Sequence, residues 1–444
     1  MSPAAGRQGP TGAGDAAVRP RRVALAPVPP PARRSLPLAD SARPVDRAAR
    51  PLYAVWEVTL RCDLACRHCS SRAGRARPDE LTTAEALDLV EQLADLGVVE
   101  VTLIGGEVYL REDWLVLVEA IRRRGMDCTM VTGGRGLTAE RARAARSVGL
   151  MSVSVSIDGA PATHDMLRGV MGSHEAAVTA MRHLAEAGMP LSANTQIGRY
   201  NRRELSDVFG TIAQAGVHSW QLQLTVAGGR VVDHPQMLLE PYHLLEVMPA
   251  IGRLKPEADR ADLRLWPGNN LGYFGPFEDL LRGELPGGHR GSCGAGRTAI
   301  GIESNGAIKG CPSLPSHEYV GGNVRDDRLR AIWERAEPLR FTRNDRRGEL
   351  WGRCAQCYYA EDCLGGCSWT AHSLLGRRGN NPFCHHRALS LLRQGRRERV
   401  VRAEAAPGVP FDHGRFQIVE EDWPAEELER AFLVAQGRER WLVD

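Results

Sequence analysis

The chain has 444 residues, 43% of them hydrophobic and 25% charged, with a formal net charge of +3. This composition is typical of a globular protein long enough for one large domain and a smaller one. The nearly balanced charge favours neither nucleic acid nor a membrane surface as a partner. No apolar run approaches the ~20 residues that a membrane-spanning helix needs.

Residues 1–50 are rich in Pro, Ala, Gly and Arg and lack the apolar core of a secretion signal. Such a composition predicts a disordered tail. Without a secretion signal, the chain is expected in the cytoplasm, where thiols stay reduced. The eleven cysteines are therefore expected to serve metal or catalytic roles rather than disulfides.

Residues 51–228 alternate between strand-like and helix-like stretches. Strands are predicted over 53–60, 99–106, 127–132, 151–159, 191–198 and 219–226. Helices are predicted over 82–97, 112–125, 138–149, 173–188 and 202–216, the first with a Thr82-x-x-Glu85 capping box. Repeated strand–helix units indicate an α/β protein with a parallel sheet, here a partial (β/α)6 barrel of TIM type. Functional loops then lie at the carboxyl ends of the strands.

The remaining residues divide into three parts. Turn-rich pieces in 229–290 indicate a bridging segment with one or two helices. Residues 291–387 contain seven cysteines and form a predicted cysteine-rich domain. Residues 388–444 join a basic stretch to an acidic, aromatic one, and are expected to be a docking helix or a mobile tail.

Cys62, Cys66 and Cys69 form a Cys-x3-Cys-x2-Cys run after the first predicted strand. Three thiolates on one short loop can hold three irons of a [4Fe–4S] cluster and leave the fourth iron open. A zinc knuckle is the alternative, but zinc sites usually have four ligands. The motif resembles the signature of the radical S-adenosylmethionine (SAM) enzymes, whose open iron binds the amino and carboxylate groups of SAM.

The second predicted strand ends in Gly105-Gly106-Glu107. Glycines let a ligand approach the backbone, and the carboxylate can accept hydrogen bonds from an ammonium group. An ordinary turn is the alternative. The position, one strand–helix unit after the cysteine loop, resembles the radical SAM motif that binds the methionyl amine. Val108 stands where the family usually has proline.

The same resemblance implies further SAM contacts. The fourth predicted strand ends in VSIDG, which contains Ser156 and Asp158, and Arg168 follows it. In the family the serine contacts SAM and the arginine pairs with the SAM carboxylate, a role that suits a guanidinium. His68 and Thr132 stand where relatives have residues beside the adenine or the adenosine. Turn capping and a solvated charge are the alternatives.

The seven C-terminal cysteines resemble the SPASM extension of radical SAM enzymes, which carries two auxiliary [4Fe–4S] clusters. The resemblance implies an outer cluster held by Cys354, Cys357, Cys363 and Cys384, and an inner cluster held by Cys293, Cys311 and Cys367. A zinc ribbon is the alternative. No further cysteine directly precedes Cys293, so the inner cluster would keep an open iron. His289, water and the substrate are its candidate ligands.

Cys128 lies outside both cysteine sets, in the middle of the third predicted strand. A thiol in such a position is expected to be a buried small hydrophobe.

The resemblance also implies the reaction. One electron enters the first cluster and splits SAM into methionine and a 5′-deoxyadenosyl radical, which abstracts hydrogen from an unactivated C–H bond. The SPASM clusters would act as electron acceptors or as an anchor for the substrate. SPASM enzymes mostly modify ribosomally made peptides or proteins, and the layout looks most like the maturases of the mycofactocin and pyrroloquinoline quinone pathways.

Three alternatives stay open at this point. A sulfatase maturase typically has aspartate after the second auxiliary cysteine, whereas Pro312 follows Cys311 here. A tetrapyrrole side-chain modifier of heme biosynthesis is the second. An iron–sulfur electron carrier is the third, but it would leave Glu107, Ser156 and Arg168 without a purpose.

The expected partners are a peptide substrate and an electron donor, either a reductase or a flavodoxin or ferredoxin. Recognition of a leader peptide could come from a separate protein or from residues 388–444.

Overall fold

The computed structural model describes residues 21–22, 37–283 and 293–442 of the chain. Six parallel strands form its centre: β2 (Tyr53–Thr59), β3 (Glu100–Gly105), β4 (Asp127–Thr132), β5 (Ser152–Ser156), β6 (Leu191–Ile197) and β7 (Ser219–Leu224). Each pairs with the next in chain order. The predicted α/β class with a parallel sheet is therefore confirmed. Cys128 in β4 is completely buried, as expected of a small hydrophobe.

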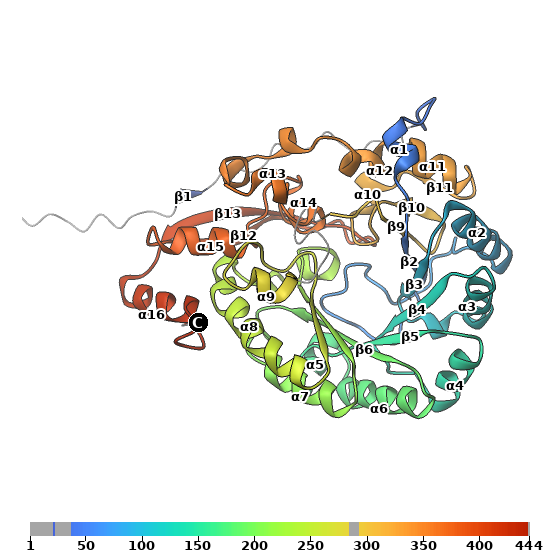
Figure 1. Ribbon diagram of the computed structural model, residues 1–444, viewed down its shortest axis with the longest axis horizontal. Coiled ribbons are helices and arrows are strands. Elements are labelled where there is room, and N and C mark those ends of the chain that lie inside the picture. The colour runs from blue at the N-terminus through green and yellow to red at the C-terminus, as the bar shows by residue number, and fades with distance from the viewer. Residues whose placement is uncertain (1–20, 23–36, 284–292, 443–444) are drawn as a thin grey trace, which may run out of the picture.

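Helices cover the outside of these strands, as Figure 1 shows. They are α2 (Thr83–Leu96), α3 (Trp114–Arg123), α4 (Ala139–Ser147), α5 (Pro161–Arg168), α6 (Ser173–Glu186) and α7 (Leu205–Gln214). The predicted capping box is present, because Thr82 Oγ1 accepts from the backbone of Glu85 and the Glu85 side chain accepts from that of Thr82. Gly97 ends α2 with a left-handed φ of 90°, which glycine adopts without strain. The short helix α5 was not predicted.

The sheet is wider than the six strands that were predicted. β8 (Arg264–Pro267) extends it in parallel beside β7, and β9 (Ala299–Ile302) does so beside β2. The antiparallel strands β10 (Ala307–Lys309) and β11 (Gly322–Asn323) follow β9, so that ten strands form one sheet. Such short strands have too few residues to show a periodic pattern, and pairing with an existing edge satisfies their backbone groups.

Over its described residues, 229–283, the bridging segment contains two α-helices, the long α8 (Leu244–Arg260) and the short α9 (Glu278–Arg282). Three turns of 3-10 helix precede α8, namely η2 (Gly229–Val232), η3 (Pro235–Met237) and η4 (Pro241–His243), and another, η1 (Val108–Leu110), follows β3. The segment thus supplies one strand of the sheet as well as the helices expected of it.

The cysteine-rich part is built from short elements. They are α10 (Ser316–Tyr319), α11 (Leu329–Arg335), α12 (Glu337–Arg340), η5 (Phe341–Arg343), η6 (Arg347–Glu349), η7 (Gly352–Gln356), α13 (Ala360–Cys363), α14 (Ser368–Leu375) and α15 (His385–Leu392). A small apolar cluster of Leu314, Tyr319 and Phe341 packs against Cys293 and Cys311. Elements this short bury little apolar surface, which is typical of modules that metal ligands stabilise.

The C-terminal residues form a β-hairpin, β12 (Arg396–Glu404) and β13 (Arg415–Asp422), followed by α16 (Ala425–Ala435). The strand β1 (Arg21–Arg22) pairs antiparallel with β13. The basic stretch that was expected in a helix or a tail is a strand, because charges pair across the hairpin, as between Arg397 and Glu421 at 2.8 Å. Leu245 of α8 packs with Trp423 and Val434 in a second apolar cluster.

Part of the predicted N-terminal tail is ordered. The helix α1 (Pro44–Ala48) carries Asp46, whose side chain is completely buried. Arg340 and Arg343 of the cysteine-rich part lie 3.2 and 3.3 Å from its carboxylate. Composition alone predicted disorder here, because these partners lie almost 300 residues away in the sequence.

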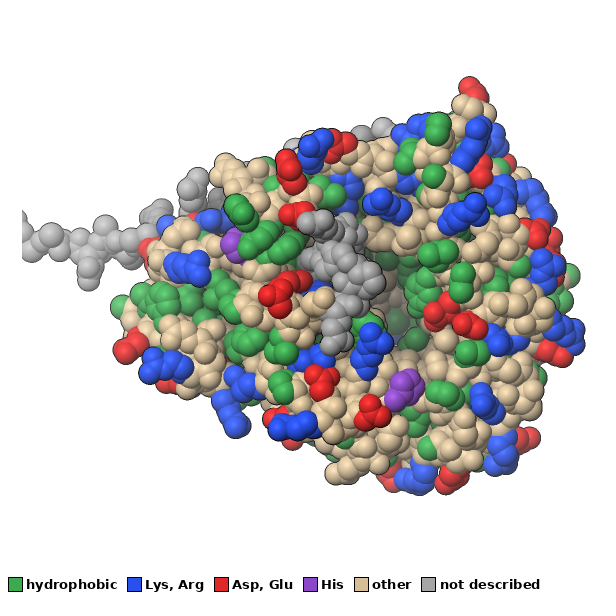
Figure 2. Space-filling view, viewed as in Figure 1, with side chains coloured by type: hydrophobic (Ala, Val, Ile, Leu, Met, Phe, Trp, Pro, Cys, Tyr) green, Lys and Arg blue, Asp and Glu red, His purple; other side chains and the backbone are tan. Residues whose placement is uncertain are grey.

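Basic and acidic side chains are interspersed over the surface, and the face seen in Figure 2 is hollowed near its centre. Within the described ranges, no helix is both long enough and apolar enough to cross a membrane.

Candidate active site

The three cysteines of the first motif lie in the long loop after β2. Cys62, Cys66 and Cys69 are free thiols. The backbone N–H of Leu64 donates to Cys62 Sγ at 3.4 Å, and that of Ala73 donates to Cys69 Sγ at 3.3 Å. Hydrogen bonds of this kind favour the thiolate, which is the form that ligates iron.

The turn after β3 holds the start of the cysteine loop. Gly106 N donates to Thr59 O at 2.7 Å, and Glu107 N donates to Arg61 O at 2.8 Å. A Cβ atom on Gly105 would lie 2.2 Å from Thr59 O, and one on Gly106 would lie 2.0 Å from Arg61 O. Backbone of the cysteine loop therefore occupies the place of a side chain at both glycines. That the glycines also let a ligand approach stays a prediction.

Two further segments hold the cysteine loop from its other side. Ala65 N donates to the carbonyl of Arg168, the last residue of α5, at 3.1 Å. Arg230 of η2 donates through Nη1 to Cys66 O at 3.0 Å. Backbone and arginine contacts therefore fix the position of the loop.

Glu107 lies buried beside the loop. Its carboxylate accepts from Thr132 Oγ1 at 2.5 Å and from Gly133 N at 2.7 Å. Ligand atoms of Cys62, Asp63 and Glu107 lie within 4.8 Å of one another. Burial raises the pKa of Glu107 to about 7. A positively charged group such as an ammonium would restore its ionised form.

Asp158 and Arg168 form a buried ion pair. Arg168 Nη2 lies 2.6 Å from Asp158 Oδ2, and His68 Nε2 lies 3.2 Å from the same oxygen. Arg168 Nη1 also reaches Cys66 Sγ at 3.8 Å. Burial acts to raise the pKa of Asp158, but Arg168 and His68 hold it well below its usual range. The structure thus joins the VSIDG motif to the cysteine loop, and His68 contacts Asp158.

Ser156 has a partner that the sequence analysis did not identify. Its hydroxyl donates to Asn194 Oδ1 at 3.0 Å, and Asn194 Nδ2 donates to Ser154 Oγ at 3.1 Å. The sequence feature that could have pointed to Asn194 is an amide side chain in the middle of a predicted strand, here β6. His164 was also missed, and its Nδ1 accepts from Asp158 N at 3.1 Å.

The first set of thiols fits an iron–sulfur cluster. Burial raises the pKa of Cys66 to about 11 and also raises that of Cys62, which the nearby Glu107 raises further. Neighbouring buried thiols cannot all ionise without positive charge close by. Iron ions would supply that charge, and Cys62, Cys66 and Cys69 offer three sulfur ligands from a single loop.

The predicted outer set of cysteines lines one pocket. The four are Cys354, Cys357, Cys363 and Cys384. Burial raises the pKa of Cys363 to about 12, and the neighbouring Cys354 and Cys357 thiols act in the same direction. Four sulfur ligands around one pocket fit a completely ligated cluster.

The predicted inner set is also brought together. Burial raises the pKa of Cys311 to about 12, and the nearby thiols of Cys293 and Cys367 raise it further. His289, the candidate fourth ligand, lies outside the described residues. Tyr273, which the sequence analysis missed, lies between the two sets: it lines the outer pocket, and its hydroxyl accepts from Cys367 N at 3.0 Å.

Two family models match these parts of the chain. Residues 56–212 match the radical SAM superfamily, and residues 293–358 match the iron–sulfur cluster-binding domain known as SPASM. The chain belongs to the radical SAM superfamily. It is therefore a radical SAM enzyme that binds SAM and iron–sulfur clusters, as the resemblance of its motifs implied. The second match ends before Cys363, Cys367 and Cys384. The structure alone therefore places these three beside the other C-terminal cysteines.

Curated relatives fall into two groups. The AdoMet-dependent heme synthase of Nitratidesulfovibrio vulgaris is 29% identical over 75% of this chain and 91% of its own length. The mycofactocin maturase MftC of Mycobacterium tuberculosis is 29% identical over 71% of this chain and 78% of its own length.

Solved structures of two other proteins share the fold. Streptococcus suis SuiB bound to S-adenosylmethionine superposes with a TM-score of 0.57 at 16% identity and covers 76% of each chain. Native anSMEcpe with bound AdoMet and the Kp18Cys peptide superposes with a TM-score of 0.61 at 16% identity, over 77% of this chain and 95% of that one.

Proposed function

We propose that this radical SAM enzyme modifies a ribosomally made peptide at one of its C–H bonds. The proposal rests mainly on one observation. The chain combines a radical SAM domain with two separate C-terminal sets of thiols. The mycofactocin maturase relative supports it, as does the shared fold of SuiB, which has been solved with its precursor peptide SuiA. SPASM enzymes mostly act on ribosomally made peptides or proteins.

The proposed site is built from the three motif loops. Cys62, Cys66 and Cys69 would hold a [4Fe–4S] cluster, and Glu107 would accept the ammonium group of SAM. Arg168, oriented by Asp158, would receive the SAM carboxylate through its remaining donors. When bound, the cluster and SAM together supply radical chemistry that no side chain can perform. The chain's own groups orient SAM and keep water from the reacting atoms.

The second and third clusters are part of the same proposal. Cys354, Cys357, Cys363 and Cys384 would enclose the outer one. Cys293, Cys311 and Cys367 would hold the inner one. These clusters would accept an electron from the modified substrate or anchor it. A flavodoxin, a ferredoxin or a reductase would supply the electron for the first cluster, and a separate protein would present the leader peptide.

The experiment is anaerobic co-expression with a short peptide encoded beside the gene, followed by mass spectrometry of the peptide. A mass change that disappears in a Cys62→Ala variant is the expected result, and fragmentation locates the altered residue. An unchanged peptide in a preparation that still cleaves SAM would refute the proposal for that peptide.

A second candidate is modification of a tetrapyrrole side chain. The likeness to heme synthases over 91% of the length of one of them favours it. The same purified enzyme would then alter the mass of a porphyrin that carries propionate side chains and leave the peptide unchanged. Incubation of both substrates in parallel separates the two candidates.

A further inference from the structure

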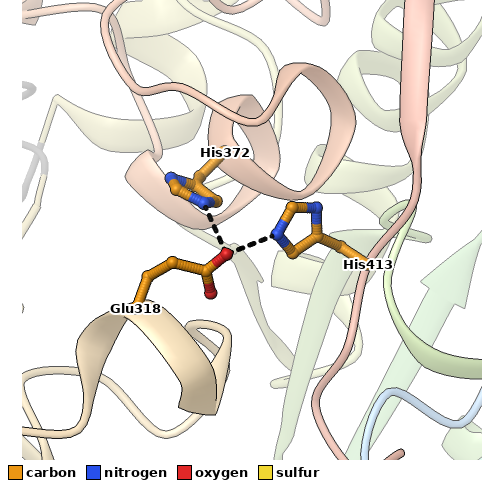
Figure 3. Close-up of side chains that lie close together, drawn as sticks. All are labelled: Glu318, His372 and His413. Carbon is orange, nitrogen blue, oxygen red and sulfur yellow. Dashed lines mark hydrogen bonds and ion pairs between the residues drawn. The ribbon is translucent and has the colours of Figure 1, made fainter. Parts of the chain in front are cut away.

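Three side chains outside the SAM site converge on one point (Figure 3). Glu318 lies on α10, His372 on α14, and His413 in the loop between β12 and β13. One ligand atom from each lies within 4.8 Å of the other two. Both imidazoles direct Nε2 at the same oxygen of Glu318, at 3.0 Å from His413 and 3.8 Å from His372.

The hydrogen bonds of His413 fix which of its nitrogens faces the carboxylate. Its Nδ1 lies 2.8 Å from Gly414 O, and because a carbonyl only accepts, Nδ1 carries a proton. In a neutral imidazole the lone pair of Nε2 would then point at Glu318 Oε1, which repels it. A cation between the two atoms, either a proton or a metal ion, removes that repulsion.

A proton on His413 would still leave one nitrogen of His372 without a hydrogen-bond partner. Its side chain is only 8% exposed. Its Nδ1 contacts the Tyr319 hydroxyl at 2.9 Å, whereas Nε2 has no hydrogen-bond partner among the described residues. Its distance of 3.8 Å from Glu318 exceeds the range of a hydrogen bond. A buried nitrogen without a partner is costly, and here it points into the group.

We propose that Glu318, His372 and His413 bind a divalent transition-metal ion of the zinc type. Ligand atoms around a tetrahedral ion with bonds of ~2.0–2.1 Å lie about 3.4 Å apart, and the observed 3.0 and 3.8 Å bracket that spacing. The contacts of both Nδ1 atoms orient the rings, as is usual for histidine ligands. Glu318 Oε2 is also buried and has no hydrogen-bond partner among the described residues.

The ion would connect parts of the chain that lie far apart in sequence. Beside His413, Asp412 accepts from Arg72 Nε at 2.8 Å, and Phe411 N donates to Ser70 O at 3.1 Å. These contacts attach the 405–414 loop to the segment just after Cys69. A metal ion at His413 would therefore hold the C-terminal hairpin between the first cysteine loop and the SPASM domain. Such a metal site would be present whichever substrate the enzyme modifies.

The test is a Zn²⁺ titration of the full-length, cluster-loaded protein after anaerobic dialysis against a chelator. We expect one tightly bound zinc per chain, with X-ray absorption showing only nitrogen and oxygen ligands at ~2.0–2.1 Å and no sulfur at ~2.3 Å. His372→Ala and His413→Ala should each weaken zinc binding at least about tenfold. Glu318→Gln, which keeps the side-chain shape, should do the same, so the test does not rest on the histidine variants alone.

His183→Ala is the matched control, because His183 is a half-buried histidine that contacts Leu137 O outside the group. It should bind zinc like the wild type, and the iron content per chain should be the same in every variant. The proposal is overturned by the absence of a saturable zinc site, by sulfur ligation of the zinc, or by unchanged zinc affinity in Glu318→Gln.

Discussion

Arg168 connects several parts of the site. Its guanidinium pairs with Asp158 and reaches the Cys66 sulfur, while its backbone carbonyl accepts from the cysteine loop. The buried Asp158 keeps one nitrogen of the guanidinium in place, so the remaining donors have a defined direction. A lysine would retain the positive charge but could not contact Asp158 and a ligand carboxylate with one planar group.

We therefore expect Arg168→Lys to weaken SAM binding roughly 10- to 100-fold, the loss of one or two charge-assisted hydrogen bonds. Equilibrium binding of SAM to the anaerobic, cluster-loaded enzyme measures the effect. Arg182→Lys, at an exposed position on α6, is the control and should bind SAM normally. Equal affinity in Arg168→Lys and the wild type would contradict the proposed role.

The element that determines the shape of the site is the turn after β3. Its two glycines allow it to touch the backbone of the cysteine loop, and hydrogen bonds from Gly106 and Glu107 lock the two segments together. Of the helices around the sheet, α5 also reaches the cysteine loop, through Arg168 at its last position. Close backbone packing therefore sets the geometry of the three thiols.

Gly106→Ala should push the turn away from Arg61 O, because the new Cβ atom would lie 2.0 Å from it. We expect a loss of about 1–3 kcal/mol in stability, as in other overpacked sites, together with a lower iron content per chain. Gly210→Ala in α7, where a Cβ atom meets nothing within 4 Å, should instead stabilise the helix by about 1 kcal/mol. Thermal unfolding and iron analysis measure both. The same result for both variants would argue against steric contact as the cause.

At the scale of the whole molecule, buried charges join the barrel to the C-terminal domain. Arg77 after the cysteine loop lies 3.1 Å from Glu57 of β2 and 2.9 Å from Glu303, which follows β9. Lys309 of β10 lies 2.8 Å from Glu303. Burial raises the pKa of Glu57 to about 7, although Arg77 acts to lower it.

This network predicts a dependence of stability on pH. Since the pKa of Glu57 in the folded chain, about 7, lies above its ordinary 4.5, the stability that its protonated form contributes is present below pH 4.5 and is lost as pH rises through 7. The side chain of Glu57→Gln stays neutral at every pH. The free energy of unfolding of this variant, relative to that of the wild type, should therefore rise by about 1 kcal/mol as the pH goes from 6 to 8.5.

Thermal unfolding of both proteins across this pH range measures that difference. Glu85→Gln is the control, because hydrogen bonding to Arg325 lowers the pKa of Glu85 to about 2. Glu85 is thus ionised in both the folded and the unfolded chain throughout the range, and its variant should show no such trend. If the difference in stability between Glu57→Gln and the wild type did not change with pH, the raised pKa of Glu57 would be contradicted.

Local patterns in the sequence determined much of this protein. The cap of Thr82 and Glu85 and the end of α2 at Gly97 depend on residues a few positions apart, so the helix was predictable. The spacing of Cys62, Cys66 and Cys69 is likewise a property of one short loop. The alternation of strand and helix periods was enough to predict the parallel sheet, because each period reports which face of an element is buried.

Only the tertiary structure decided which distant residues meet. The short strands β8 and β9 exist because the sheet offers them an edge, and Asp46 is buried because two arginines from the C-terminal domain neutralise it. The tertiary structure also decided three further placements: Asn194 beside Ser156, Tyr273 between the two thiol sets, and His413 beside Glu318. A hydrogen bond or an ion pair depends on distance in space, and chain segments that lie far apart in sequence come within that distance only after the whole molecule has folded.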